Sequence, residues 1–262
     1  GGVVTLAVGD AAAVLADYLL GFCQRLVRTP SLPGQEHAVQ EVVAEEMARL
    51  GLDVTRVPVR YADLEGHPAF SDDGFPPDGR ANVIGRWDGA DPAGPGHSLV
   101  LNGHVDVVAP GDLAQWTVDP WSGTISGGRL HGRGACDMKS GLAAGLYGLA
   151  ALREAGLRPR HDVQVQAVIG EESGGVGALA AILAGHTADA ALILEPTRLA
   201  LCPVQSGALT FRLTVPGLSA HGALRQLGVS AIEKFSLLHG AILALEERRH
   251  ASFAHPLHEE PR

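Results

Sequence analysis

Histidine and carboxylate residues fall where predicted strands end or helices begin, and these are residue types that bind divalent metal ions. The set comprises His104, Asp106, Asp137, Glu171, Glu172 and Glu195. Imidazole and carboxylate groups in one place suit zinc or a similar divalent ion. A carboxylate that bridges two ions, and a second that accepts a proton from water, are parts of a two-metal hydrolase.

Each of these residues has an ordinary explanation when it is taken alone. A lone His or Asp at a strand end is usually capped or solvated. The pair Glu171-Glu172 is typical of a helix N-terminus, where the helix dipole favours acids. Glu195-Pro196 is a common way to leave a strand. Their joint occurrence in one chain favours a site.

The elements that would position this site alternate between strands and helices. Apolar periodicity predicts a helix at residues 35–50, a turn and helix at 133–155, and another at 171–183. Strands are predicted at residues 53–59, 81–87, 98–108, 161–169 and 190–194. Such alternation is typical of an α/β fold with a largely parallel sheet, in which ligands bind beyond the carboxyl ends of the strands.

The pattern changes after Val204. Residues 208–215 alternate as a strand would, and residues 229–249 form an amphipathic helix. Its predicted inward side chains are Ile232, Phe235, Leu238, Ile242 and Leu245. We place a domain boundary near Ser206, with residues 1–205 in a catalytic domain and residues 206–262 beginning a second one. A single strand and helix are too little to stand alone, so we expect the chain to be part of a longer protein.

Composition excludes several classes of function. The net charge is −9 and the pI about 5.7, which disfavours nucleic-acid binding. No apolar run reaches the ~18 residues that a membrane span needs. Three cysteines cannot form an even set of disulfides, which favours a reducing, cytoplasmic location.

Five motifs occur in an order that resembles the M20 metallopeptidase family. They are Leu101-Asn102-Gly103-His104-Val105-Asp106, Gly132–Gly141, Gly170–Gly175, Leu194-Glu195-Pro196-Thr197 and Gly217-Leu218-Ser219-Ala220-His221-Gly222. Residues 67–70 and the run 80–85 resemble the acetylornithine-deacetylase-like branch. The resemblance implies a zinc-aminopeptidase-like α/β catalytic domain, with a mostly parallel central sheet flanked by helices, followed by the start of an α+β dimerisation (lid) domain.

The resemblance also implies a role for each metal ligand. His104, Asp137 and Glu195 would hold one ion, and Asp137 would bridge to a second ion that Glu172 also binds. Asp106 would hold the His104 ring in place. A cis peptide bond is expected between Asp137 and Met138.

Two further residues are catalytic by the same resemblance. Glu171 would be the general base and then the proton donor to the leaving amine. His221 would reach across a homodimer, formed through the second domain, and stabilise the oxyanion.

The implied activity is a dinuclear zinc-dependent, or cobalt-dependent, removal of an acyl group from an N-acyl amino acid. One alternative is a dipeptidase or carboxypeptidase of the same family acting on short peptides. Another is a non-catalytic fragment, because the family's last ligand, a histidine near the C-terminus, has no counterpart in the right context here.

Overall fold

The computed structural model describes residues 2–205, 207, 211–253 and 256. The chain divides into two compact units, Gly1–Leu199 and Ala200–Arg262, which are described separately. The division falls a few residues before the boundary expected near Ser206. Assignment of residues 206–262 to a dimerisation domain stays a prediction.

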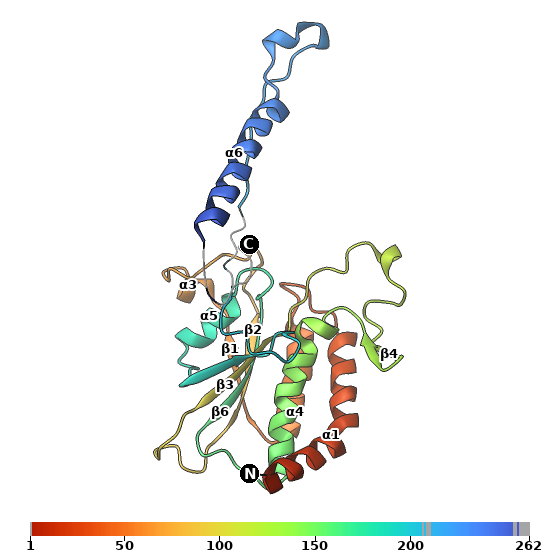
Figure 1. Cartoon of the computed structure of the whole chain (residues 1–262), viewed down its shortest axis with the longest axis vertical. Coiled ribbons are helices and arrows are strands. Elements are labelled where there is room, and N and C mark those ends of the chain that lie inside the picture. The colour runs from red at the N-terminus through yellow and green to blue at the C-terminus, as the bar shows by residue number, and fades with distance from the viewer. Residues whose placement is uncertain (1, 206, 208–210, 254–255, 257–262) are drawn as a thin grey trace. The chain divides into compact units, whose positions relative to one another are not determined.

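A five-stranded sheet in the order β1-β2-β6-β3-β7 forms the centre of the first unit (Figure 1). The strands are β1 (Asp53–Pro58), β2 (Ala81–Trp87), β3 (Leu99–His104), β6 (Val163–Val168) and β7 (Ala190–Ile193). β2 is antiparallel to both β1 and β6, whereas β3 is parallel to β6 and β7. Four of the five strands therefore run in one direction, which confirms the mostly parallel sheet.

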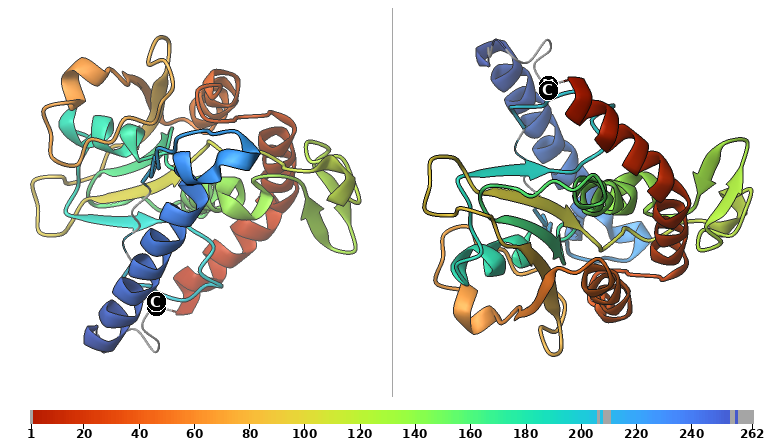
Figure 2. Two further views of the ribbon diagram at one scale, coloured as in Figure 1. Left: turned by 90° about the horizontal axis from the view of Figure 1, so that it is seen from above. Right: turned by 90° about the horizontal axis from the view of Figure 1, so that it is seen from below.

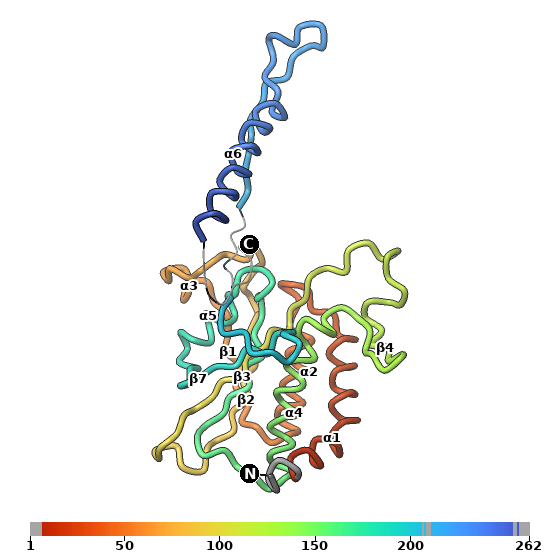
Figure 3. The backbone as a smooth tube through the Cα atoms, viewed as in Figure 1, coloured from red at the N-terminus to blue at the C-terminus, as the bar shows by residue number. Residues whose placement is uncertain are grey.

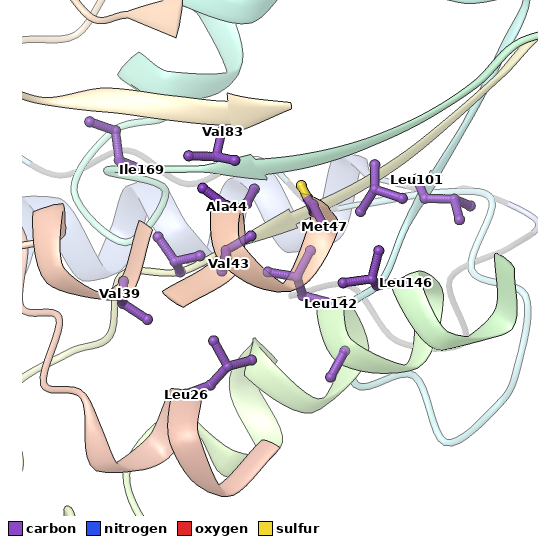
Figure 4. Close-up of a cluster of buried hydrophobic side chains, with 14 of the residues drawn as sticks. Leu26, Val39, Val43, Ala44, Met47, Val83, Leu101, Leu142, Leu146 and Ile169 are labelled. Carbon is purple, nitrogen blue, oxygen red and sulfur yellow. The ribbon is translucent and has the colours of Figure 1, made fainter. Parts of the chain in front are cut away.

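Helices cover both faces of the sheet. α2 (His37–Arg49) and α4 (Ser140–Glu154) pack on one face, where Met47 and Leu142 lie below the strands that carry Val83 and Leu101 (Figure 4). α5 (Val176–Leu183) packs on the other face, against β1, β2 and β6. Val83 belongs to the main core and its neighbour Ile84 to the cluster with Ala181, because successive side chains on a strand point to opposite faces.

The structure adds a long helix that the sequence analysis did not predict. α1 (Gly2–Arg28) packs beside α4 (Figure 2). Its C-terminal half buries Phe22, Leu26 and Val27. Leu15, Leu19 and Phe22 pack on the core at helical spacing, so the helix is stabilised by burying one apolar face. Within the described part of the chain, no helix is both long and apolar enough to cross a membrane.

Shorter elements connect the main ones. The segment that follows β1 contains the short helix α3 (Tyr61–Leu64). β4 (Thr124–Ser126) and β5 (Arg129–His131) form a separate hairpin. A 3-10 turn spans Leu113–Gln115. The segment Ala135–Lys139, a π-type turn in which Asp137 and Met138 depart from helical backbone angles, leads into α4. β7 occupies the edge of the sheet (Figure 3).

The second unit contains the 3-10 segment Gly222–Leu227 and the helix α6 (Ala231–Ser252). The Ser230 hydroxyl accepts a hydrogen bond from the Glu233 N–H at 3.2 Å and so caps α6, which confirms the predicted helix. Leu218 and Val229 pair in an isolated antiparallel bridge.

Two expectations for this unit were wrong where the structure describes it. Residues 208–210 of the predicted strand lie outside the described residues, and residues 211–215 form no strand. No neighbouring strand pairs with them among the described residues, and a strand needs such a partner. The helix residues expected to face inward are exposed, and α6 has no buried residue, because the described part of this unit offers no second layer to pack against.

Candidate metal centre

The carboxyl ends of three parallel strands bring the predicted site residues together. β3 ends at His104, which lies opposite Val168 of β6. Glu171 and Glu172 follow β6 in a glycine-rich turn, and Glu195 follows β7. Because these strands are parallel and adjacent, their ends meet at one edge of the sheet, as the sequence predicted.

The ring of His104 is held in one tautomer. Its Nδ1 lies 2.8 Å from the main-chain carbonyl oxygen of Asp106. A carbonyl only accepts, so Nδ1 carries the hydrogen and donates it. In the neutral ring, Nε2 is then unprotonated, which is the form that a metal ligand needs.

Nε2 of His104 faces three carboxylates. It lies 3.1 Å from Asp137 Oδ1, 3.6 Å from Glu195 Oε1 and 3.8 Å from Glu171 Oε2. Two groups have ligand atoms within 4.8 Å of one another: His104 with Glu171 and Glu195, and His104 with Asp137 and Glu172. The four residues that the sequence analysis assigns to metal ions all lie in these groups, but the division differs from the expected one. Glu171, the expected base, is grouped with His104 and Glu195, and Asp137 is grouped with His104 and Glu172.

The cluster is open to solvent on one side. His104 is 1% exposed, whereas the side chains of Asp137, Glu171 and Glu195 are 57%, 46% and 32% exposed. A buried imidazole therefore forms the floor, and carboxylates form a rim that a substrate can reach.

Electrostatics favour a cation in this cluster. Burial raises the pKa of Glu172, and the neighbouring charge of Asp137 raises it further. Burial and the charges of Asp137 and Glu171 also raise the pKa of Glu195, against the opposing effect of His104. Burial alone would lower the pKa of His104, but the surrounding carboxylates, Asp106 first among them, raise it. Several acids around one imidazole are a donor set that fits divalent metal ions.

Asp106 lies beneath the cluster and links two of its members. It is fully buried, and its Oδ2 accepts a hydrogen bond from the Glu172 N–H at 3.0 Å. Its Oδ1 lies 3.7 Å from His104 Nδ1 and has no hydrogen-bond partner among the residues that the structure describes. Burial raises the pKa of this carboxyl group. The His104 ring is therefore held by the carbonyl of Asp106, with the carboxylate close behind it.

Two buried side chains, Met138 and Lys139, hold the segment that carries Asp137. The Asp137–Met138 peptide bond is cis, as expected. Met138 is buried, and its sulfur lies 3.3 Å from the His104 main-chain nitrogen. Sequence reasoning gave no role to Lys139, which is fully buried and donates to the carbonyl oxygens of Leu26 and Thr29 at 2.8 and 2.9 Å. Burial lowers the pKa of Lys139 to about 7.

His221 belongs to the second unit. It caps the 3-10 segment Gly222–Leu227, and its Nδ1 accepts a hydrogen bond from the Ala223 N–H at 3.2 Å. Because Nδ1 is the acceptor, the proton of the neutral ring lies on Nε2, which is free to donate.

Known proteins resemble this chain in sequence. The model of peptidase family M20/M25/M40 matches residues 100–254. A succinyl-diaminopimelate desuccinylase from Variovorax paradoxus is 31% identical over 81% of this chain and 53% of its own length. A second desuccinylase, from Methylobacterium sp. (strain 4-46), is 35% identical over 86% of this chain and 55% of its own length. An N-formyl-4-amino-5-aminomethyl-2-methylpyrimidine deformylase from Halalkalibacterium halodurans is 34% identical over 57% and 37%.

Solved structures resemble it in fold. An M20 family metallo-carboxypeptidase from Sulfolobus solfataricus superposes with a TM-score of 0.54 at 20% identity, over 67% of this chain and 36% of the other. A tripeptidase from Staphylococcus aureus superposes with a TM-score of 0.51 at 25% identity, over 82% of this chain and 53% of the other. The chain spans about half the length of the first two desuccinylases. The family model and these relatives agree, and the chain belongs to peptidase family M20/M25/M40.

Proposed function

We propose that this chain carries the metal-binding part of a hydrolase that removes an acyl group from an N-acyl amino acid, in the manner of an acetylornithine deacetylase. The observation that carries the proposal is the meeting of His104, Asp137, Glu171, Glu172 and Glu195 at the ends of three parallel strands. The named relatives that support an acyl substrate are desuccinylases and a deformylase.

We assign His104, Asp137 and Glu195 to one ion, and Asp137 and Glu172 to a second. Zinc is the expected metal and cobalt an alternative, since both accept imidazole and carboxylate ligands. When bound, the ions supply charge that polarises the amide carbonyl and lowers the pKa of water. The exposed carboxylate of Asp137, 3.1 Å from His104 Nε2, suits the bridging position.

Glu171 acts as the proton carrier in this proposal. Its half-exposed carboxylate lies at the open side of the cluster, where water and substrate enter. It takes a proton from the attacking water as the new C–O bond forms. It then gives that proton to the amine nitrogen as the C–N bond breaks, which releases a carboxylic acid and an amine.

We propose that His221 of the partner subunit of a homodimer donates its Nε2–H to the oxyanion. The hydrogen bond from the Ala223 N–H to Nδ1 supports this role, because it leaves the proton on Nε2. Loss of such a donor typically lowers kcat by about 10²–10³-fold. We place the enzyme in the cytoplasm, since Cys23, Cys136 and Cys202 are all free thiols.

The test is a hydrolysis assay with Zn²⁺ or Co²⁺ on this chain and on the complete product of its gene. The substrates are N-acetyl, N-succinyl and N-formyl amino acids, with dipeptides and tripeptides as the competing class. We expect turnover of an acyl amino acid, and its loss in Glu171→Gln with metal content unchanged. A preference for peptides would show that the substrate class is peptides and not acyl amino acids. Full activity in Glu171→Gln would overturn the assignment of the base.

A further inference from the structure

The turn that carries Glu171 and Glu172 is rich in glycine and has two main-chain hydrogen bonds of its own. The Gly175 N–H donates to the Gly170 carbonyl at 2.7 Å, and the Gly174 N–H donates to the Glu171 carbonyl at 3.2 Å. The turn contains Gly170, Gly174 and Gly175, all with positive φ angles of 65°, 143° and 81°. Glycine has the widest conformational freedom of all residues, so contacts from outside add to these bonds in holding the turn in one shape. The position of both carboxylates therefore depends also on the residues that surround the turn.

Asn82 joins the two ends of this turn. It lies on β2 and is fully buried. Its Oδ1 accepts a hydrogen bond from the Ile169 N–H at 3.1 Å, and its Nδ2 donates to the Gly177 carbonyl at 2.7 Å. Ile169 precedes the turn and Gly177 follows it. The Gly177 N–H also donates directly to the Ile169 carbonyl at 3.1 Å, so the Asn82 amide reinforces a closure that the main chain makes as well. A Cβ at Gly177 would lie 2.7 Å from the Asn82 oxygen, so the close approach requires glycine there.

Asp73 holds the turn from another side. Its buried carboxylate accepts a hydrogen bond from the Ser173 hydroxyl at 3.4 Å and pairs with Arg80 at 2.8 Å. Arg80 is itself buried and pairs with Glu36 at 2.8 Å. A buried guanidinium between two carboxylates is fixed in place, because breaking either pair leaves an uncompensated charge. Ser173 directly follows the two glutamates, and its hydroxyl is therefore bonded to a carboxylate whose position is fixed.

We propose that Asn82 and Asp73 are positioning residues that aim Glu171 and Glu172 at His104. The inference rests on the proposed metal centre, because fixing these two carboxylates affects function only if the cluster binds an ion. Neither residue touches the cluster: Asn82 acts through the main chain at both ends of the turn, and Asp73 acts through Ser173.

The test compares Asn82→Ala, Ser173→Ala and Ser173→Thr with the unmodified chain. Ser173→Thr keeps the hydroxyl and serves as the conservative rescue. Tyr147→Phe is the matched control, because it deletes a hydroxyl that donates to buried Glu46 at 2.6 Å, between α4 and α2. The first readout is hydrogen exchange at the amides of residues 170–177 in metal-free protein. The second is the affinity for Co²⁺, measured by its visible absorption.

We expect faster exchange in the turn and about 10- to 100-fold weaker Co²⁺ binding in Asn82→Ala. A smaller loss is expected in Ser173→Ala, with recovery in Ser173→Thr and no change in Tyr147→Phe. Unchanged exchange in the turn of Asn82→Ala and Ser173→Ala would overturn the positioning roles, whether or not metal binds. Absence of Co²⁺ binding by the unmodified chain would overturn the metal centre and with it this inference.

Discussion

Asp106 connects His104 and Glu172 through two different groups. Its carbonyl oxygen accepts from His104 Nδ1 at 2.8 Å, and its carboxylate accepts from the Glu172 N–H at 3.0 Å. One buried residue thereby orients the ring of His104 at the end of β3 and fixes the main chain of Glu172 after β6.

Loss of the Asp106 carboxylate should therefore weaken metal binding while the fold persists. We expect Asp106→Ala to bind Zn²⁺ or Co²⁺ about 10- to 100-fold more weakly, since residues that orient ligands contribute at this level. Asp106→Asn keeps one acceptor for the Glu172 N–H and should lose less. The measurement is competition of each variant against a chelator of known affinity. Equal affinity for all three proteins would contradict the role of the carboxylate.

Two glycines of α4 should respond in opposite ways to alanine. A Cβ at Gly141 would collide with the carbonyl oxygen of Leu194, the residue before Glu195, whereas a Cβ at Gly148 meets nothing within 4 Å. We expect Gly141→Ala to lower both the free energy of unfolding and the affinity for metal. Gly148→Ala should raise the free energy of unfolding by up to about 1 kcal/mol. Denaturant unfolding of both variants checks this, and similar effects at the two positions would contradict it.

Stability should fall in acid because of Glu46. Burial alone would raise the pKa of Glu46, but hydrogen bonds from Arg49 and Tyr147 outweigh it and hold the pKa below its ordinary value. Ionised Glu46 therefore adds to the free energy of unfolding above about pH 4.3, the pKa of a glutamate in the unfolded chain. This contribution is lost as the pH falls through the lower pKa of Glu46 in the folded protein. Glu46→Gln should cost about 1–3 kcal/mol at pH 7, as for a buried hydrogen-bonded charge, and much less near pH 3.

The control for this change is the adjacent Glu45→Gln. Glu45 pairs with Arg25 at 2.9 Å, but its side chain is 69% exposed. An exposed pair contributes less than about 1 kcal/mol, so this variant should change little at any pH. Urea unfolding of both variants at pH 7 and pH 3 gives the comparison. Equal losses in the two variants at pH 7 would contradict the role given to Glu46.

The three thiols should differ in reactivity. Cys136 and Cys202 are exposed, whereas Cys23 is buried and burial raises its pKa to about 11. A thiolate is the reactive form, so Cys23 should resist a thiol reagent at pH 8. We expect two fast-reacting thiols in native protein and three after denaturation, counted by absorbance. A third fast thiol in the native protein would place Cys23 outside the core.

The sequence was sufficient for the parts of the molecule governed by local patterns. Apolar runs predicted all five strands of the sheet, and the ends of β3, β6 and β7 predicted where His104, Glu171 and Glu195 would meet. These predictions succeed because side-chain period and strand direction are local properties. The structure then showed which of the gathered groups are buried and which are open.

Features that depend on distant contacts escaped prediction. α1 is stabilised by packing on α4, more than 100 positions away along the chain. The supports of the glutamate turn join Asn82 to Gly177 and Asp73 to Ser173, 95 and 100 residues apart. Residues 211–215 of the predicted strand form no strand for the same reason, because a strand is completed by a partner and not by its own sequence.

Strand register has a consequence for how this protein would be made in a cell. β3 is aligned with β6 at His104–Val168 and with β7 at Asn102–Ile193, so the proposed ligands are spaced by two separate pairings. A slip of one residue in either pairing moves a strand end by about 3.3 Å and turns its side chains to the opposite face. An ion would then bind to correctly paired chains and not to wrongly paired ones. In a refolding experiment, the fraction of the protein that regains metal would equal the fraction of molecules whose strands are in register.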